Sequence, residues 1–529
     1  AAAIAQVNNN IYFVTIPQSG KSVNISVADA KSAAFPSKLL TEIGGEFPSW
    51  QADGKTIHWS LGAAHFTYDI DAAYAFDDSL AAAKKLEASI KKDSVKKDST
   101  NIVKKDDKKE SPKYKATETW VKVYYENDMP STTVLLTNAR IITMNGDQVI
   151  NNGDILVVKN RIQAVGKSGS LKVPAGAKRV NLDGKTVVPG FVDTHSHMWP
   201  SRGIHKNQAW IYAANLAYGV TTTRDPQTAT TDVLTYSDLV EAGKMVGPRV
   251  YSTGPGVGYW SYNLKDSAQA ESVLAQYSKY FNTKYIKMYL VGNRKHRQWV
   301  IQAAKNQKLM PTTEGGLDFK LNMTNLIDGY PGHEHSLPIY PLYNDVVKTI
   351  ATSKMAVTPT LLVSYGGPWA ENFYYETENV YGDAKMQYYT PYEELASKSR
   401  RRATWFLPEE HVFQKHAKSM KQLVEAGGLA GIGSHGQLQG LGYHWELWSM
   451  QSGGMRNLDA LKTATILGAE SLGLDKDLGS ISAGKLADLI ILNKNPLEDI
   501  KNTNSIQYIM KNGRLYNGAN LDELVTGNS

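Results

Sequence analysis

The sequence predicts an α/β protein whose main body is a (β/α)8 barrel, with β structure before and after it. From about Gly190 onward, strand-like runs alternate with helical runs over nearly 300 residues. This alternation favours a parallel sheet and, at this length, an eight-stranded barrel. Short β runs precede this stretch from Thr132 and return after a helical run that ends near Leu474. The chain has 529 residues, enough for two or three domains with a large core.

The composition is that of a globular protein without thiol chemistry. Hydrophobic residues make up 42% of the chain and charged residues 21%. There is no cysteine, which excludes disulfides, thiolate metal sites and cysteine nucleophiles. We predict a periplasmic or secreted bacterial protein, with a cytoplasmic location as the alternative. No apolar run is long enough to span a bilayer, so we expect no membrane span. The start "AAAIAQVNNN" has neither a signal-peptide pattern nor an initiator Met, and we expect a processed or excised piece of a longer protein.

The basic balance of the chain comes from one segment. The net charge is +7, but twelve Lys face six acidic residues between Lys84 and Lys115. Elsewhere 46 basic residues face 45 acidic ones, so the rest of the chain is almost neutral. We therefore expect no nucleic-acid partner.

Residues 1–75 contain four short strand-like runs: "NIYFVTI", "KSVNISV", "KTIHWSL" and "HFTYDID". The stretch "FPSWQADGKTIHWS", with its Asp-Gly turn, resembles a blade of a Tol-type β-propeller. One or two blades fit, whereas a propeller needs at least about four to close. We expect a partial β-propeller whose missing blades come from a preceding segment or another chain; a small β extension is the alternative.

The next segment, residues 76–118, is rich in Lys, Asp and Ser and has few bulky apolar residues. Such a composition buries too little surface to offset the entropy lost on ordering, so it predicts a flexible linker. Two β segments, 119–190 and 476–520, flank the predicted barrel at 191–475, and residues 521–529 form a tail. We expect both flanks to pair into one small β-sandwich.

The strongest local signal is "VVPGFVDTHSHMWP", where a Pro-Gly turn and an apolar run lead to His195 and His197. Residues two apart on an extended strand project to the same side. Two imidazoles on one face at the carboxyl end of a barrel strand are suited to holding a divalent metal.

Together with this motif, several others occur in order: "GVTTTRDP", "YIKMYL", "GHEHS", "GIGSHG", "ALKTATILGAESLGL" and "GSISAGKLADLIIL". The chain from about Thr132 to Gly518 thereby resembles the amidohydrolase superfamily, in the branch related to imidazolonepropionases and Xaa-Pro dipeptidases. Within that superfamily it is similar to a group that fuses a Tol-type propeller to the hydrolase. The resemblance covers nearly three-quarters of the chain.

The resemblance implies a set of metal ligands. His195 and His197 match the first-strand pair. Lys287 matches a fourth-strand lysine that such enzymes often carbamylate, which gives a carboxylate that bridges two metals. His335, the second histidine of "GHEH", matches the sixth-strand ligand. His333 lies on the same face if that run is extended, so it is the candidate to replace or assist His335 beside substrate.

Two positions depart from the family pattern. The fifth strand usually carries a histidine ligand, but here "PTTEGG" offers Glu314, either as a ligand or as a surface acid. The eighth strand usually carries an aspartate that is both ligand and base, but here it carries His435. Gly436 lets the chain turn directly after this imidazole, so we expect His435 to face the metal as ligand or proton shuttle. The two exchanges together roughly conserve the charge of the site.

Weaker candidates surround this set. Tyr289 shares the strand face of Lys287 and is a candidate to reach substrate. Arg224 follows the second strand and either contacts substrate or forms an internal ion pair. The aromatic stretches "GGPWAENFYYE" and "GYHWELWSM" either wall a pocket for a bulky substrate or pack against the propeller.

These features predict a metal-dependent hydrolase of amide, peptide or cyclic amide bonds, with a small molecule or short peptide as substrate. One or two divalent ions would polarise the scissile carbonyl and lower the pKa of a water to about 7. His435 or Glu314 would move the proton to the leaving nitrogen. Zinc suits an imidazole-rich site, and manganese and iron accept the same ligands. The alternative is a propeller-coupled binding or scaffold protein on a barrel that has lost catalysis.

Overall fold

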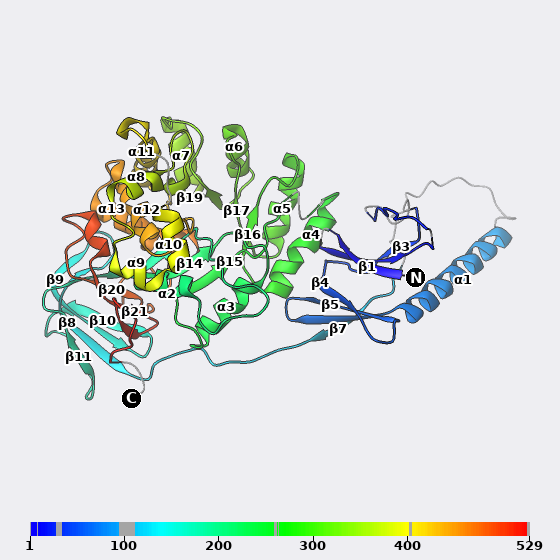
Figure 1. The fold of residues 1–529 in the computed structure, drawn as a ribbon, viewed down its shortest axis with the longest axis horizontal. Coiled ribbons are helices and arrows are strands. Elements are labelled where there is room, and N and C mark those ends of the chain that lie inside the picture. Colours follow the sequence, from blue (N-terminus) through cyan, green and yellow to red (C-terminus); the bar gives the residue numbers. More distant parts are fainter. Residues whose placement is uncertain are drawn as a thin grey trace. The chain divides into compact units, whose positions relative to one another are not determined.

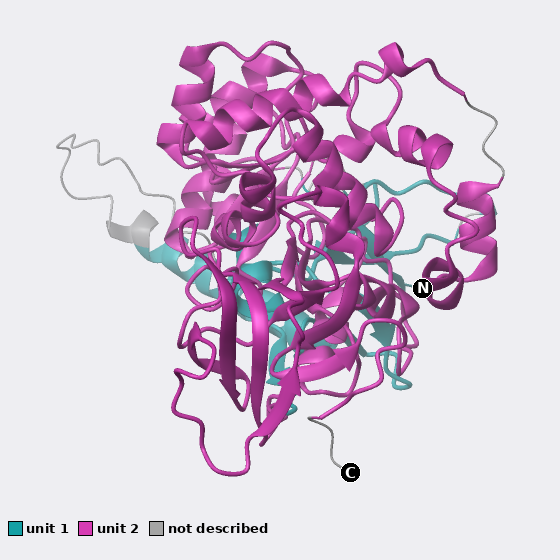
Figure 2. Cartoon of the chain, turned by 90° about the vertical axis from the view of Figure 1, so that its left-hand side faces the viewer, with its two compact units in different colours: residues 1–124, 260–263, 272–282 teal, residues 125–259, 264–271, 283–529 magenta. Residues whose placement is uncertain are grey.

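The computed structural model describes residues 2–7, 9–18, 20–27, 34–94, 112–258, 262, 264–400 and 405–525. Their contacts divide the chain into two compact units, which Figure 2 colours separately. The first unit comprises residues 1–124, 260–263 and 272–282, and the second comprises 125–259, 264–271 and 283–529. None of the helices in these described segments is long and apolar enough to cross a membrane.

The first unit contains two small antiparallel sheets. One has the order β1-β2-β3 and the other β4-β5-β6-β7. Their strands are β1 (Ala2–Val7), β2 (Asn10–Thr15), β3 (Ser37–Leu39), β4 (Glu46–Trp50), β5 (Thr56–Leu61), β6 (Ala64–Asp69) and β7 (Thr117–Trp120). A shared core forms around Ile11, Ile57, Trp59 and Tyr68 because strand alternation turns these side chains to one face.

Three sequence predictions for this unit were wrong. Residues 76–94, predicted as linker, belong to helix α1 (Ile70–Ser94), because Ala, Leu, Lys and Glu favour helix even where little apolar surface is buried. The run 21–27 forms no strand. Residues 117–120 form β7, which pairs with β6 and so lies in neither the predicted linker nor the flanking sheet. Of the rest of the predicted linker, residues 112–116 form neither helix nor strand, and 95–111 lie outside the described residues.

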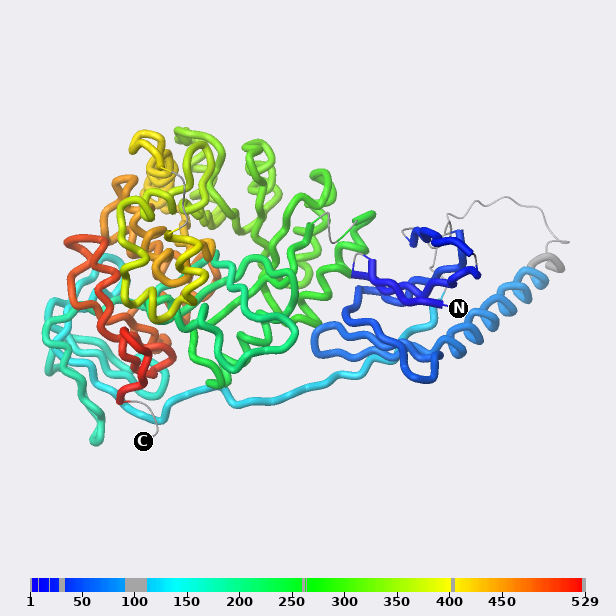
Figure 3. Tube along the Cα trace, viewed as in Figure 1, coloured from blue at the N-terminus to red at the C-terminus, as the bar shows by residue number. Residues whose placement is uncertain are grey.

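In the second unit, strands from both flanks of the barrel region share one sheet. Its order is β10-β9-β8-β12-β20-β21-β22, and β11 pairs with β8. The strands are β8 (Thr133–Ile142), β9 (Val149–Val158), β10 (Arg161–Lys167), β11 (Lys178–Asn181), β12 (Thr186–Pro189), β20 (Leu489–Leu492), β21 (Ile506–Lys511) and β22 (Arg514–Asn517). The join is the antiparallel pair β12–β20, and the red segment that carries β21 and β22 accordingly lies beside the cyan segment that carries β8–β10 in Figure 3.

Seven parallel strands form the central part of the second unit. They are β13 (Phe191–Asp193), β14 (Val220–Asp225), β15 (Arg249–Ser252), β16 (Tyr285–Met288), β17 (Met310–Thr313), β18 (Gly332–Glu334) and β19 (Ala356–Thr358). They make two sheets, β13-β14-β15 and β16-β17-β18-β19. Parallel bridges join Val257 to Met288, Val357 to Ala430 and Asp193 to Ile432. The run around Ala430 and Ile432 therefore lies between β19 and β13.

Helices alternate with these strands, as Figure 1 shows. They are α2 (Trp210–Ala217), α3 (Asp232–Glu241), α4 (Ser267–Ala275), α5 (Arg294–Asn306), α6 (Phe319–Ile327), α7 (Asn344–Ser353), α8 (Ala370–Thr377), α9 (Ala384–Tyr389), α10 (Tyr392–Ser399), α11 (Phe413–Glu425), α12 (Leu441–Ser452), α13 (Asn457–Thr463) and α14 (Ile466–Ser471). A π-helical turn covers Gln276–Phe281, and 3-10 turns cover Leu361–Val363, Pro408–Glu410 and Ile500–Asn504. Helix α5 shows why such segments fold: the Asn293 side chain caps its first N–H groups, and Val300 and Ala304 are buried one turn apart.

Candidate metal centre

Four histidines follow the carboxyl ends of three parallel runs. His195 and His197 come directly after β13, His335 comes directly after β18, and His435 ends the bridged run that contains Ile432. Carboxyl ends of parallel strands meet on one side of a sheet, which is where α/β folds with parallel strands place their sites.

The four imidazoles form one cluster. The ring centroid of His195 lies 5.0 Å from that of His335 and 5.0 Å from that of His435. The ring of His197 lies 4.8 Å from the ring of His435. One nitrogen each of His195, His335 and His435 lies within 4.8 Å of the others. Three imidazole nitrogens at this separation suit a single divalent ion.

Two of these histidines have left-handed backbone conformations, His335 with φ 71° and His435 with φ 59°. The amide of His435 donates to the carbonyl of His195 at 2.7 Å, which ties the turn to the first histidine. Gly436 follows with φ 75°, and a Cβ atom there would lie 2.6 Å from the His197 carbonyl oxygen. The chain therefore turns directly after His435, and only glycine fits the next position.

His195 is fully buried and is oriented by Glu334. Its Nδ1 lies 2.5 Å from a carboxylate oxygen of Glu334, whose other oxygen accepts hydrogen bonds from Thr312 and Arg224. The Nε2 atom of His195 has no hydrogen-bond partner among the described residues. Burial, with the nearby Lys287 and the other imidazoles, holds the pKa of His195 well below its ordinary value. The ring is therefore neutral, and its unpaired nitrogen can bind a metal.

Glu334 was not among the residues singled out from the sequence. It stands between the two histidines of "GHEH", and both were interpreted as facing the site. Glu334 could have been found from the sequence, because an acidic residue in an apolar, buried strand needs a partner such as an imidazole. An unpaired carboxylate is costly there.

On the other side of the cluster, Glu314 joins His335 to Lys287. Its carboxylate lies 3.4 Å from Nε2 of His335 and 2.8 Å from Nζ of the fully buried Lys287. Burial alone would raise the pKa of Glu314, but His335 and Lys287 hold it well below its ordinary value. Burial alone would lower the pKa of Lys287, but Glu314 and Tyr289 raise it. Glu314 is thus a carboxylate and Lys287 an ammonium in the unmodified chain.

Hydrogen bonds orient the remaining imidazoles. Nδ1 of His197 lies 3.3 Å from the carbonyl oxygen of Gln227, and Nδ1 of His435 lies 3.1 Å from Oε1 of Gln437. Burial, followed by the charges of neighbouring imidazoles, holds the pKa of His435 well below its ordinary value. Protonation does not compete with metal binding by such a ring near neutral pH.

The three candidates for substrate contact, Tyr289, Arg224 and His333, lie in different surroundings. The ring of Tyr289 stacks on Lys287, with Nζ 4.7 Å from its centroid. Of the two alternatives for Arg224, the structure has the internal ion pair: the side chain is buried and donates to Glu334 and to the Thr194 carbonyl. The placement of His333 beside His335 was wrong. It lies among Leu326, Met355 and other residues of the helical layer, because the left-handed turn at His335 breaks the strand alternation.

The family of the chain agrees with a metal centre of this kind. The profile of the amidohydrolase family matches residues 186–516, and the chain belongs to this family. It is 36% identical over 77 residues to imidazolonepropionase of Streptomyces coelicolor, a stretch covering 13% of this chain and 19% of that protein. It is 32% identical over 107 residues to ochratoxinase of Aspergillus niger, covering 20% of this chain and 22% of that protein. These matches span only about a fifth of either relative.

Solved structures extend the similarity over most of the chain. The structure of a Xaa-Pro dipeptidase with bound methionine superposes with a TM-score of 0.56 at 20% identity, covering 73% of this chain and all of that one (100%). The structure of A. niger ochratoxinase gives a TM-score of 0.55 at 18% identity, covering 74% of this chain and 96% of that one. At these identities the likeness shows a shared fold.

Proposed function

We propose that the protein is a metal-dependent hydrolase of amide, peptide or cyclic amide bonds. The observation that carries this proposal is the convergence of nitrogen atoms of His195, His335 and His435 within 4.8 Å of one another. Family membership supports it, as do relatives whose names denote an imidazolonepropionase, a Xaa-Pro dipeptidase and an ochratoxinase.

The donor set fits a divalent ion, most readily zinc. His195, His335 and His435 would hold it, with His197 beside them, and the unpaired Nε2 of His195 is the buried donor that such an ion would satisfy. When bound, the ion would polarise the scissile carbonyl and lower the pKa of the attacking water to about 7.

Other residues would orient the metal ligands and transfer the proton. Glu334 and Arg224 hold the tautomer and orientation of His195, and Thr360 holds those of His335 through a hydroxyl 2.5 Å from Nδ1. Glu314 is a partly exposed carboxylate beside His335. We assign it the transfer of the water's proton to the leaving nitrogen, which leaves His435 as a ligand.

The proposal is tested by metal content together with turnover on a panel of dipeptides and lactams. We expect about one tightly held ion per chain and turnover that chelation abolishes. A purified protein with well under one ion per chain and no turnover on the panel would instead favour the catalytically silent binding or scaffold protein.

We infer that Lys287 becomes a ligand only after carbamylation. As an ammonium it repels a metal, but its neutral amine can attack carbon dioxide: an N–C bond forms, a proton leaves, and a carbamate anion results. The site would then hold a second ion. The full burial of Lys287 on β16 supports this inference, because burial by itself lowers the pKa of the amine and so favours its neutral form.

We also propose that the parallel strands close into a (β/α)8 barrel with the run around Ala430 and Ile432 as eighth strand. The bridges from this run to β19 and β13, and from Val257 to β16, support closure. Amide hydrogen exchange tests it: the amides of Thr194 and Gly431, which donate to Ile432 and Val357, should exchange as slowly as those of β14.

For the first unit we propose a partial propeller completed by further blades. Its four-stranded sheet β4-β5-β6-β7 is antiparallel, and Phe47 on edge strand β4 is 78% exposed. Open edges of this kind attract further strands. Hydrogen exchange of the isolated chain should be fast in β1–β3. Protection there equal to that of the second unit, in a proven monomer, would contradict the proposal.

A further inference from the structure

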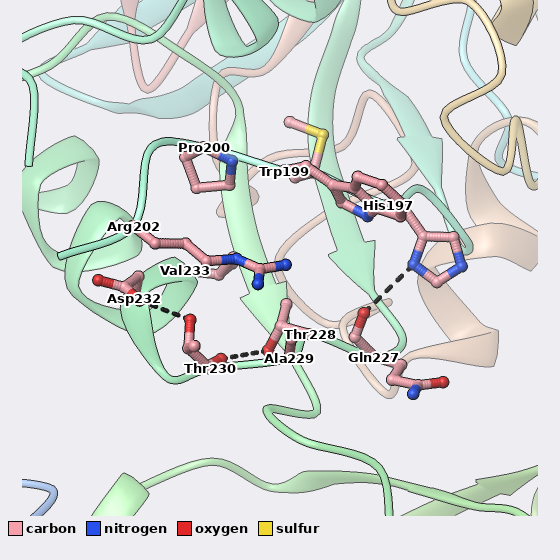
Figure 4. Close-up of a pocket in the computed structure, with 11 residues that line it drawn as sticks. His197, Trp199, Pro200, Arg202, Gln227, Thr228, Ala229, Thr230, Asp232 and Val233 are labelled. Atoms are coloured by element: carbon pink, nitrogen blue, oxygen red, sulfur yellow. Dashed lines mark hydrogen bonds between the residues drawn. The ribbon is translucent and has the colours of Figure 1, made fainter. Parts of the chain in front are cut away.

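A cavity of about 330 Å3 opens beside the histidine cluster, on the side of His197. Figure 4 shows the side chains that line it, which come from the segment after β13 and from the segment leading into α3. They include His197, Trp199, Pro200, Arg202, Gln227 and Val233. A volume of this size accepts a substrate group larger than a single aliphatic side chain.

The cavity adjoins the histidine cluster at His197, which lines the cavity and lies beside His195 and His435. The ring centroid of His197 lies 4.8 Å from that of His435, 5.2 Å from that of His195 and 6.2 Å from that of Trp199. Nδ1 of His197 lies 3.3 Å from the Gln227 carbonyl oxygen, and this contact holds the ring between the other histidines and the cavity. A substrate held at the histidines would direct one end past His197 into this space.

The walls are of two chemical kinds. Trp199, Pro200 and Val233 supply apolar surface, and the Trp199 side chain is 69% exposed, so its ring is available to a ligand. In Figure 4 the Arg202 side chain, from the same segment as Trp199 and Pro200, extends into the space between the labelled residues. Within the described part of the chain, its guanidinium has neither a hydrogen bond nor an ion pair.

The acid in the lining, Asp232, is already compensated. It accepts hydrogen bonds from His205 at 2.6 Å, from Thr230 at 2.5 Å and from the amide of Gly203 at 3.1 Å. The charge of Arg202 is therefore left for a ligand. One uncompensated guanidinium with an anionic Asp232 in the same wall favours a singly charged carboxylate over a doubly charged phosphate.

We propose that this cavity is the specificity pocket and that it takes a substrate end combining a planar apolar body with a carboxylate. Trp199 packs against the body and Arg202 pairs with the carboxylate. The substrate class is then an amide whose acyl or amine part carries a free carboxylate. This inference rests on the proposed hydrolase function, and its test is chosen to give a result even if no turnover is found.

Two probes without an amide bond separate charge from shape: hydrocinnamate and its neutral counterpart, hydrocinnamyl alcohol. Binding of each to the protein as purified is measured by isothermal titration calorimetry. We expect hydrocinnamate to bind at least about tenfold more tightly, a preference that Arg202→Gln removes and Arg202→Lys partly restores. The control Arg179→Gln removes an exposed arginine on β11 and should keep the preference.

Trp199→Ala should weaken binding of both probes by a similar factor. An absent preference in the unaltered protein, or a preference that survives Arg202→Gln, would overturn the assignment of Arg202, as would failure of both probes to bind. A preference that chelation removes while Arg202→Gln does not would put the carboxylate on the metal and would equally overturn it. A protein without metal or turnover that still shows the Arg202-dependent preference would contradict only the hydrolase function.

Discussion

The Nδ1 atom of His195 and a carboxylate oxygen of Glu334 lie 2.5 Å apart, and both side chains are almost completely buried. The two residues come from the first and sixth parallel strands, β13 and β18, and are 139 positions apart in the chain. This contact fixes which nitrogen of His195 carries the proton. The opposite nitrogen is thereby presented to the centre of the histidine cluster.

Replacement of Glu334 by Gln should weaken both metal binding and folding. The amide cannot accept from His195, Thr312 and Arg224 together, and Arg224 is left as a buried cation. We expect metal affinity to fall about 10–100-fold and the free energy of unfolding to fall by about 3–5 kcal/mol. Competition with a chromogenic chelator and urea unfolding measure the two. Glu241→Gln is the control, since Glu241 also pairs with an arginine but lies away from the cluster.

The turn after His435 gives a second prediction. Gly436→Ala puts a Cβ atom 2.6 Å from the His197 carbonyl oxygen and forces alanine to adopt φ 75°. Gly473→Ala imposes a similar φ, 66°, with no atom within 4 Å. Both variants should lose about 1–2 kcal/mol of stability, but Gly436→Ala alone should also lose metal, because its clash displaces His435. Equal metal content in the two variants would show that this turn does not position a ligand.

A third prediction concerns Lys287. Supplying bicarbonate during metal loading should raise the content from about one to about two ions per chain, since carbamylation replaces a cation with a ligand. Lys287→Met should stay near one ion under both conditions. Elemental analysis measures the content, and a carbon-13 signal from labelled bicarbonate identifies the carbamate. If the unaltered protein binds the same number of ions with and without bicarbonate, Lys287 is not carbamylated and remains the ammonium partner of Glu314.

The buried His444 provides a prediction on pH and stability. Burial lowers its pKa to about 3, although its hydrogen bond to the Tyr218 carbonyl opposes this. The unfolded chain has the ordinary pKa of about 6.5. Between these values the unfolded state binds the proton and the folded state does not, so stability falls as the pH drops from 6.5 toward 3, by up to about 1.4 kcal/mol per pH unit.

His444→Gln removes this titration, so its deficit in unfolding free energy relative to the unaltered protein should shrink between pH 7.5 and pH 5. Urea unfolding of both proteins after chelation checks this. A deficit that is the same at both pH values would mean that His444 is not buried in its neutral form.

Local sequence predicted the strand-helix alternation and the pair His195 and His197, because both follow from simple periodicity around a Pro-Gly turn. It misplaced His333 in "GHEH", because strand alternation puts His333 on the same face as His335. The left-handed backbone at His335 instead turns Glu334 and His335 toward the cluster. That conformation depends on the hydrogen bond from the His335 amide to Thr358, a long-range contact that no local pattern specifies. Helix α1 was missed because the linker prediction relied on the small number of apolar residues that the segment can bury. The helix propensity of its Ala, Leu, Lys and Glu residues outweighed that shortage.

The most direct test of the account is the metal content of the double variant His195→Ala/His197→Ala, measured by elemental analysis beside the unaltered protein. His296→Ala is the control, because that histidine lies on α5 and contacts Asn293. We predict about one or more ions per chain in the unaltered protein and in the control, and almost none in the double variant, with an unchanged circular dichroism spectrum. Full metal content in the double variant, or none in the unaltered protein, would contradict the account.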